Sequence, residues 1–150
     1  MGASDHLEDR GRSGFFRGLT AALLEFAEAH FALSKPDATT GKTRLTTLLE
    51  IREQTGIVAP ELAALPSAPL ETEHIWLWFC ALSRARGAGF SVSAISWADV
   101  AAYFNLMSIT PQRWEVASLF ALDDAFLASR VNETSGSVGG AKALKGQING

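Results

Sequence analysis

The sequence predicts an all-α protein, a single helical bundle of about five helices with flexible tails at both ends. Three observations predict this fold class. Apolar side chains recur at intervals of three and four residues, which places them on one face of a helix. Signals for helix starts and stops separate the periodic segments. The one β-like stretch, residues 90–95, is too short and too rich in serine to build a sheet.

The first two predicted helices lie before residue 57. The first spans about 20 residues and ends before Pro36, because the residue that precedes a proline is disfavoured in a helix. Its apolar face comprises Phe16, Leu19, Leu23, Phe26, His30 and Leu33. The second helix is expected from Thr43 to Gln54, with Gly56 as its stop signal. Residues 60–65 add one or two turns, since Pro60 suits a first helical position.

The third predicted helix, residues 70–86, follows a proline-rich break at residues 66–69. Its main apolar stripe comprises Ile75, Trp78, Phe79 and Leu82, and its flanks carry Trp76, Leu77 and Cys80. An apolar surface of this width is typical of a central helix or of one that also contacts a partner.

The last two predicted helices each have a start signal. Ser96 and Asp99 have the spacing of a capping box for a helix that ends near Met107. Thr110 and Pro111 start a final helix, which we expect to end near Arg130.

We expect one domain, because a chain of 150 residues rarely divides into two cores. Apart from Met1, residues 1–12 contain one large apolar side chain, Leu7, and residues 131–150 are rich in glycine. Both ends are therefore predicted to be flexible. The helical domain is expected over residues 13–130, with N-terminal helices in 13–65 and C-terminal helices in 70–130.

Composition excludes several functional classes. The chain has 13 basic and 16 acidic side chains, a net charge of −3, which argues against nucleic-acid or anionic-membrane binding. No apolar run approaches the roughly 20 residues of a membrane span, and no secretory signal is visible. A lone cysteine excludes an intramolecular disulfide and suits a reducing cytosol. We therefore expect a soluble cytosolic protein.

We expect no catalytic residue, no cofactor site and no metal site. The three histidines lack metal-ligand spacing, and His30 fits the edge of a core. Cys80 is surrounded by apolar residues and has no nearby base, so a packed thiol is expected. Residues 39–43 (TTGKT) resemble part of a phosphate loop, but Pro36 replaces the required glycine. We interpret them as a turn that starts a helix.

Two pairs of carboxylates, Glu25 with Glu28 and Asp123 with Asp124, are candidates for general acid–base chemistry. Adjacent residues on a helix point about 100° apart, so Asp123 and Asp124 cannot easily share one site. We expect these pairs to lie on a solvated polar face or on a rim that meets a basic partner.

Residues 96–126 imitate a DNA-reading helix-turn-helix. Their second helix has one cation, Arg113, against three carboxylates, which is unfavourable for phosphate contacts. We therefore interpret these helices as a packing pair and keep a DNA-binding regulator as an alternative.

A string of apolar anchors marks residues 70–130. Its most specific part is Trp114-Glu115, followed by Leu122-Asp123 and Phe126-Leu127. The remaining residues of the string are Trp76, Trp78, Phe79, Leu82, Gly89, Phe90, Ile95, Ser96, Trp97, Asp99, Val100, Ala102, Tyr103, Val116 and Ala128. This string resembles the C-terminal region of small tail assembly chaperones of long-tailed bacteriophages and prophages.

The resemblance implies a non-catalytic factor in the host cytoplasm that binds the tape measure protein and is absent from the mature virion. The major tail protein and a second copy of the chain are further candidate partners. We expect partner-binding residues among Trp76, Leu77, Cys80, Trp97, Tyr103, Phe104 and Trp114, although Trp78 and Trp114 also suit a core. A structural tail or connector component retained in the virion is the remaining alternative.

Overall fold

The computed structural model describes residues 3–86 and 92–138, and over these residues it contains helices and connecting segments but no strand. The helices are α1 (Ala3–Leu33), α2 (Arg44–Thr55), α3 (Pro60–Ala63), the 3-10 helix η1 (Leu70–Thr72), α4 (Glu73–Arg84), α5 (Trp97–Leu106) and α6 (Arg113–Val138). The predicted all-α class is confirmed.

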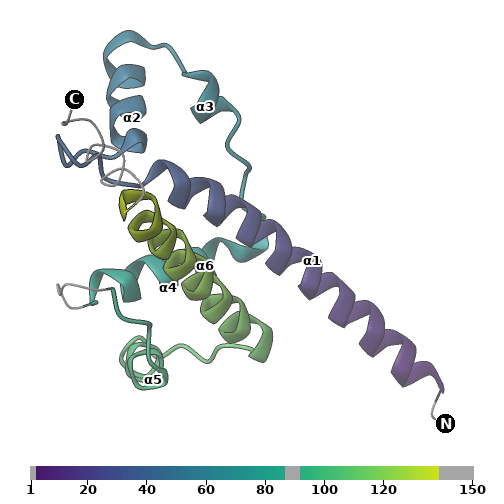
Figure 1. Ribbon diagram of the computed structural model, residues 1–150. Coiled ribbons are helices and arrows are strands. Elements are labelled where there is room, and N and C mark those ends of the chain that lie inside the picture. Colours follow the sequence, from purple (N-terminus) through teal and green to yellow (C-terminus); the bar gives the residue numbers. More distant parts are fainter. Residues whose placement is uncertain (1–2, 87–91, 139–150) are drawn as a thin grey trace, which may run out of the picture.

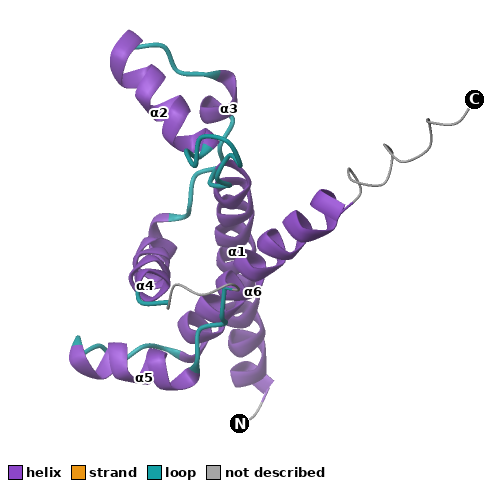
Figure 2. Ribbon diagram, turned by 60° about the vertical axis from the view of Figure 1, so that its left-hand side comes forward, coloured by secondary structure: helices purple, strands orange, loops and turns teal. Residues whose placement is uncertain are grey.

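Helices α1, α4 and α6 form the body of the molecule, in which α6 packs against both of the others (Figure 1). Helix α5 contacts this body through α4. Helix α2 contacts α1, which is the longest helix in the described part of the chain. Helices α2 and α3 form an arm at one end of α1, away from α5 (Figure 2). The N-terminal turns of α1 project beyond the other helices (Figure 1).

The core lies where these helices meet. Its buried residues are Leu23, Ala27, Phe31, Ile75, Phe79, Leu82, Ile95, Val100, Phe104, Leu119 and Leu122. Spacings of three and four residues recur within α1, α4 and α6, as the apolar periodicity predicts. Full burial of one Leu or Phe side chain contributes about 1.5–3 kcal/mol. The core therefore includes residues of α1 as well as of the C-terminal helices.

Local sequence signals explain where most helices begin and end. The Thr43 hydroxyl accepts from the Thr46 backbone N–H at the start of α2, and Gly56 ends that helix at a φ of 71°. This left-handed backbone is cheapest for glycine. Ser96 and Asp99 form a complete capping box at the start of α5. The sequence predicts the Gly56 stop signal and the capping box of α5, and the structure confirms both.

The structure corrects the prediction at both ends of the helical region. Helix α1 begins at Ala3, so residues 3–12, predicted to be unfolded, are helical. Helix α6 continues to Val138 rather than ending near Arg130, and residues 139–150 lie outside the described part of the chain. The prediction was based on the small number of apolar side chains that these segments could bury in a core. An existing helix elongates at lower cost, because each added residue gains one backbone hydrogen bond.

The start of α6 also differs from the prediction. The helix begins at Arg113, two residues after the predicted first residue, Pro111. Glu115 Oε2 accepts from the Gln112 backbone N–H at 2.6 Å, and Gln112 O accepts from the Val116 N–H at 3.2 Å. The Glu115 side chain thus caps the helix at Gln112.

Candidate functional site

The seven candidate partner-binding residues differ widely in exposure. Trp97 and Leu77 are exposed at 70% and 60% of their surface. Phe104 is buried in the core. Half-buried positions are occupied by Trp76, Cys80, Tyr103 and Trp114. The structure therefore leaves Trp97 and Leu77 most accessible to a partner.

Trp76 belongs to an aromatic cluster between α1 and α4. Its ring centroid lies 5.0 Å from that of Phe26, 5.1 Å from His30 and 5.6 Å from Phe79. Burial lowers the pKa of His30, because the charged imidazolium loses hydration. His30 thus occupies the edge of the core, as the sequence predicts, and Trp76 holds α1 against α4.

Helix α5 presents apolar side chains at both of its ends. Trp97, its first residue, lies with its ring centroid 4.3 Å from that of Phe120 on α6 while most of its surface stays exposed. At the other end Leu106 is 82% exposed, and Met107 is also exposed. An indole held by one neighbour and otherwise accessible offers a large contact area at low entropic cost.

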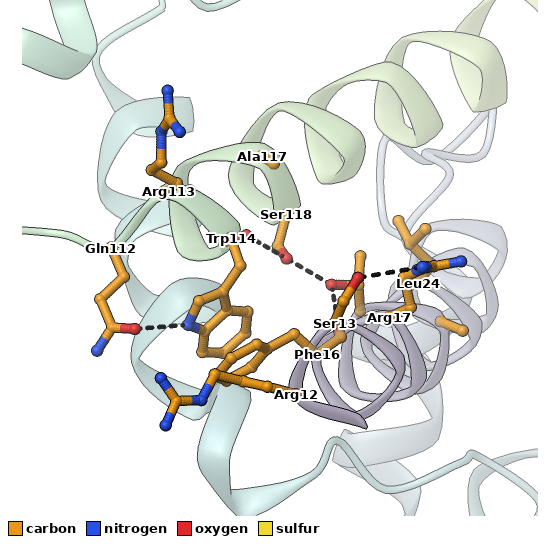
Figure 3. Close-up of a pocket in the computed structure, with 12 residues that line it drawn as sticks. Arg12, Ser13, Phe16, Arg17, Leu24, Gln112, Arg113, Trp114, Ala117 and Ser118 are labelled. Carbon is orange, nitrogen blue, oxygen red and sulfur yellow. Dashed lines mark hydrogen bonds between the residues drawn. The ribbon is translucent and has the colours of Figure 1, made fainter. Parts of the chain in front are cut away.

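A groove of about 930 Å³ lies between α1 and α6 (Figure 3). Phe16 of α1 and Trp114 of α6 stack at its base, with centroids 4.7 Å apart and ring planes 16° apart. The hydroxyls of Thr20 and Ser118 are 2.7 Å apart and join the same two helices. Ala21, Leu24 and Ala117 add apolar lining. The groove lining therefore combines two aromatic rings, smaller apolar side chains and hydroxyl groups.

Arginines surround this groove. Arg12, Arg17 and Arg113 line it, and its lining contains no aspartate or glutamate. All three arginines are exposed, and Arg17 donates to the Ser13 hydroxyl at 3.0 Å. Sequence reasoning missed this groove because its two walls are almost 100 positions apart. Phe16 and Trp114 belong to two predicted helices, but no local sequence pattern indicates that the two side chains contact each other.

Trp114 and Glu115, the most specific pair in the string of apolar anchors, form contacts within the fold. The Glu115 carboxylate lies 2.7 Å from His74 Nε2 and also caps α6 through Gln112. Trp114 donates its indole N–H to the Gln112 side chain at 3.1 Å and stacks on Phe16. The Trp-Glu pair thus orients the start of α6 against both α1 and α4.

Asp123 corrects the expectation of a solvated carboxylate pair. Its side chain is buried, pairs with Arg86 and accepts from the Ile95 backbone N–H at 2.8 Å. Asp124 alone is exposed. Because adjacent helical positions point about 100° apart, one aspartate faces the interior while the next faces solvent. The sequence predicts the angle between the two side chains, but it does not indicate which of the two aspartates faces the core.

Among the residues that the structure describes, no three or more histidine, cysteine, aspartate or glutamate side chains are grouped so that they could hold a metal ion. Burial raises the pKa of the Cys80 thiol, which opposes formation of the nucleophilic thiolate. Among the helices described, none has the length and apolar character of a membrane span.

The segment 39–43 forms the turn before α2, as predicted. Asp37 Oδ1 accepts from the backbone N–H groups of Thr39 and Thr40, at 2.8 and 2.9 Å. These contacts lower the pKa of Asp37. Lys42 pairs with Glu50 at 3.0 Å, so its ammonium group is engaged within the chain. The segment follows a helix and serves as a helix-starting turn.

One face of α6 belongs to the core, because Leu119 and Leu122 are buried. Helix α5 contacts α6 through Trp97 and Phe120, whose ring centroids are 4.3 Å apart. A recognition helix would also need cations for phosphate contacts, and residues 111–126 offer one, Arg113. This charge distribution disfavours the helix-turn-helix alternative.

Comparison with known proteins adds one finding. A family model described as phage tail assembly chaperone matches residues 51–128. The matched segment starts within α2, contains α3, η1, α4 and α5, and ends within α6. It covers nearly all of residues 70–130, where the sequence motifs lie. No curated protein and no solved structure matches the chain.

Proposed function

Because the chain belongs to the phage tail assembly chaperone family, we propose that it binds the tape measure protein and assists tail tube assembly without catalysing a reaction. The proposed site of action is the host cytoplasm, before the virion is complete. The observation that carries the proposal is the exposed apolar surface of the segment that matches the family.

Large apolar side chains are exposed mainly within that segment. Eleven such residues are exposed in the described part of the chain, and nine of them lie within residues 51–128. The nine are Ile51, Ile57, Val58, Leu70, Leu77, Val92, Trp97, Leu106 and Met107. These exposed apolar side chains are available for contact with another protein, and they lie in the segment that matches the family.

A tape measure protein suits this surface. We expect it to be a long amphipathic helical chain whose apolar stripes aggregate before the tail tube encloses them. An apolar helix face binds against apolar side chains of another protein, and tryptophan often dominates such contacts. We therefore place Trp97 and Leu77 in the contact, with Trp76, Cys80, Tyr103 and Trp114 at its margins and Phe104 supporting them from the core.

Absence of catalysis is supported by the roles of the polar residues. Asp123 and Glu115, the motif carboxylates, are engaged in an interior ion pair and in a helix cap. Cys80 has a raised pKa because of burial. These groups stabilise a binding scaffold.

Co-expression tests the proposal. The full chain is produced together with the tape measure protein encoded in the same gene cluster, and the soluble fraction is purified through a tag on the chain. We expect the tape measure protein to stay soluble and to co-purify, whereas it should aggregate when expressed alone. Its aggregation in both cases would contradict the proposal.

Two further measurements separate the alternatives. Mass spectrometry of purified virions should find the tape measure protein without this chain, and stoichiometric amounts of the chain would instead support a structural tail component. A gel-shift assay with duplex DNA should show no binding. A shift that weakens steeply with added salt would support a DNA-binding regulator.

A further inference from the structure

We propose that the groove between α1 and α6 binds an amphipathic helix whose apolar stripe is flanked by carboxylates. This inference rests on the proposed function, because it assigns a binding site and a partner chemistry to the chaperone. It goes beyond the family match, since the α1 wall of the groove lies outside residues 51–128.

The base of the groove matches an apolar helix face. The rings of Phe16 and Trp114 stack on each other, and both remain partly accessible where they line the groove (Figure 3). Ala21 on α1 and Ala117 on α6 are exposed, and their short side chains leave room for a helix to approach. Large side chains of a bound helix would therefore pack on the two rings.

The positive charges around the groove indicate which side chains should flank the apolar stripe of the bound helix. Arg12, Arg17 and Arg113 are exposed, and none forms an ion pair with a carboxylate whose side chain the structure describes. Glu115, the nearest acidic residue in sequence to Arg113, is engaged with His74 and Gln112. The whole chain carries a net charge of −3, so this concentration of positive charge is local.

Charge complementarity therefore selects one occupant. Guanidinium groups favour carboxylates, with which they form paired hydrogen bonds. The large apolar base disfavours nucleic-acid phosphates, which bind through polar contacts. A helix with leucines on one face and glutamates beside them satisfies both the base and the arginines.

The first test compares two synthetic peptides that differ only in their charged flanks. Both are about five turns long and carry the same leucine stripe at helical spacing, one flanked by glutamates and the other by lysines. We expect fluorescence anisotropy to show at least tenfold tighter binding of the glutamate peptide to the full chain. This preference should weaken as salt is added. Equal affinities would overturn the proposal.

Groove variants locate the peptide. Arg17→Glu combined with Arg113→Glu should remove the preference for the glutamate peptide, whereas Arg52→Glu with Arg84→Glu makes the same charge change at exposed positions outside the lining. Ala117→Trp should block the groove, and Ala128→Trp, also at an exposed position of α6, should not. Equal effects of each variant and its control would overturn the proposal. So would displacement of the peptide by phosphatidylglycerol vesicles.

The outcomes for the groove and for the proposed function are distinguishable. Failure of both peptides to bind, while the tape measure protein co-purifies equally with the wild-type chain and with the Ala117→Trp variant, would overturn the groove assignment alone. Groove-dependent binding of the glutamate peptide, without any effect on tape measure solubility, would overturn the proposed function and support the peptide site. Circular dichroism and urea unfolding verify that each variant is folded.

Discussion

The Arg86 guanidinium and the Asp123 carboxylate form an ion pair in the interior between the end of α4 and the middle of α6. Arg86 also donates to the Ser93 carbonyl at 2.8 Å, and Asp123 accepts from the Ile95 N–H at 2.8 Å. The guanidinium lies over the Phe126 ring, 4.8 Å from its centroid. One pair of side chains thus connects α4, α6 and the segment that leads into α5.

Replacing Asp123 with alanine should destabilise the fold strongly. Removal of one partner of a buried ion pair typically costs about 3–5 kcal/mol, because the remaining charge stays buried. The free energy of unfolding, measured by urea titration and circular dichroism, should fall by an amount in that range.

Asp124→Ala is the matched control for this change. Asp124 is adjacent in sequence but exposed, so its replacement should change stability by no more than about 0.5 kcal/mol. Similar losses for both variants would contradict the structural role assigned to the Arg86–Asp123 pair.

Trp97→Ala should weaken binding of the tape measure protein with little loss of stability. The indole is largely exposed and contacts Phe120, so its truncation removes little core packing. Truncation of a tryptophan at the centre of an interface typically costs about 2 kcal/mol or more, which corresponds to roughly 30-fold weaker binding or more. Quantitative co-purification from cells that express both proteins measures this effect.

Val131→Ala serves as the comparison, because Val131 is an exposed apolar residue of α6 outside the segment that matches the family. Its co-purification yield should equal that of the wild-type chain. Unchanged binding by the Trp97→Ala variant would show that Trp97 is not part of the contact with the tape measure protein.

Much of the fold is predictable because its determinants are local. Thr43 and Gly56 bound α2, and Ser96 with Asp99 starts α5, through contacts within a few residues. The apolar periodicity likewise indicates which faces of the helices are buried, since the 3.6-residue repeat is a property of each helix alone.

The site is harder to predict because it depends on how the helices are placed. Asp123 is buried because α6 turns it towards Arg86, which is 37 positions away. The arginine-lined groove exists because Phe16 meets Trp114 across two distant segments. Neither pairing has a local signature. Trp76 shows the same effect, since it lies off the main stripe of α4 but is covered by α1.

Stability should fall at mildly acidic pH because of His30. Burial holds the pKa of folded His30 below its ordinary value, so the unfolded chain takes up a proton first as the pH falls. The contribution of neutral His30 to the free energy of unfolding is therefore complete above a pH of about 6.5, the ordinary pKa of histidine. It is lost as the pH falls below this value. Urea midpoints measured between about pH 7.5 and pH 5.5 should show this loss.

His30→Gln isolates the contribution of this side chain. The variant lacks the titrating imidazole, so the part of the loss that is due to His30 should disappear. A pH dependence identical to that of the wild-type chain would show that the His30 pKa is the same in the folded and unfolded states.

Cys80 should react slowly with iodoacetamide in the folded chain. Burial raises the pKa of its thiol, and the nearby charge of Arg84 offsets part of this effect by favouring the thiolate. Because the thiolate is the reactive form, alkylation at about pH 8, followed by mass spectrometry, should be several-fold slower in the folded chain than in urea. Arg84→Gln should slow the reaction further. Equal rates in the folded and unfolded chain would contradict a packed thiol at this position.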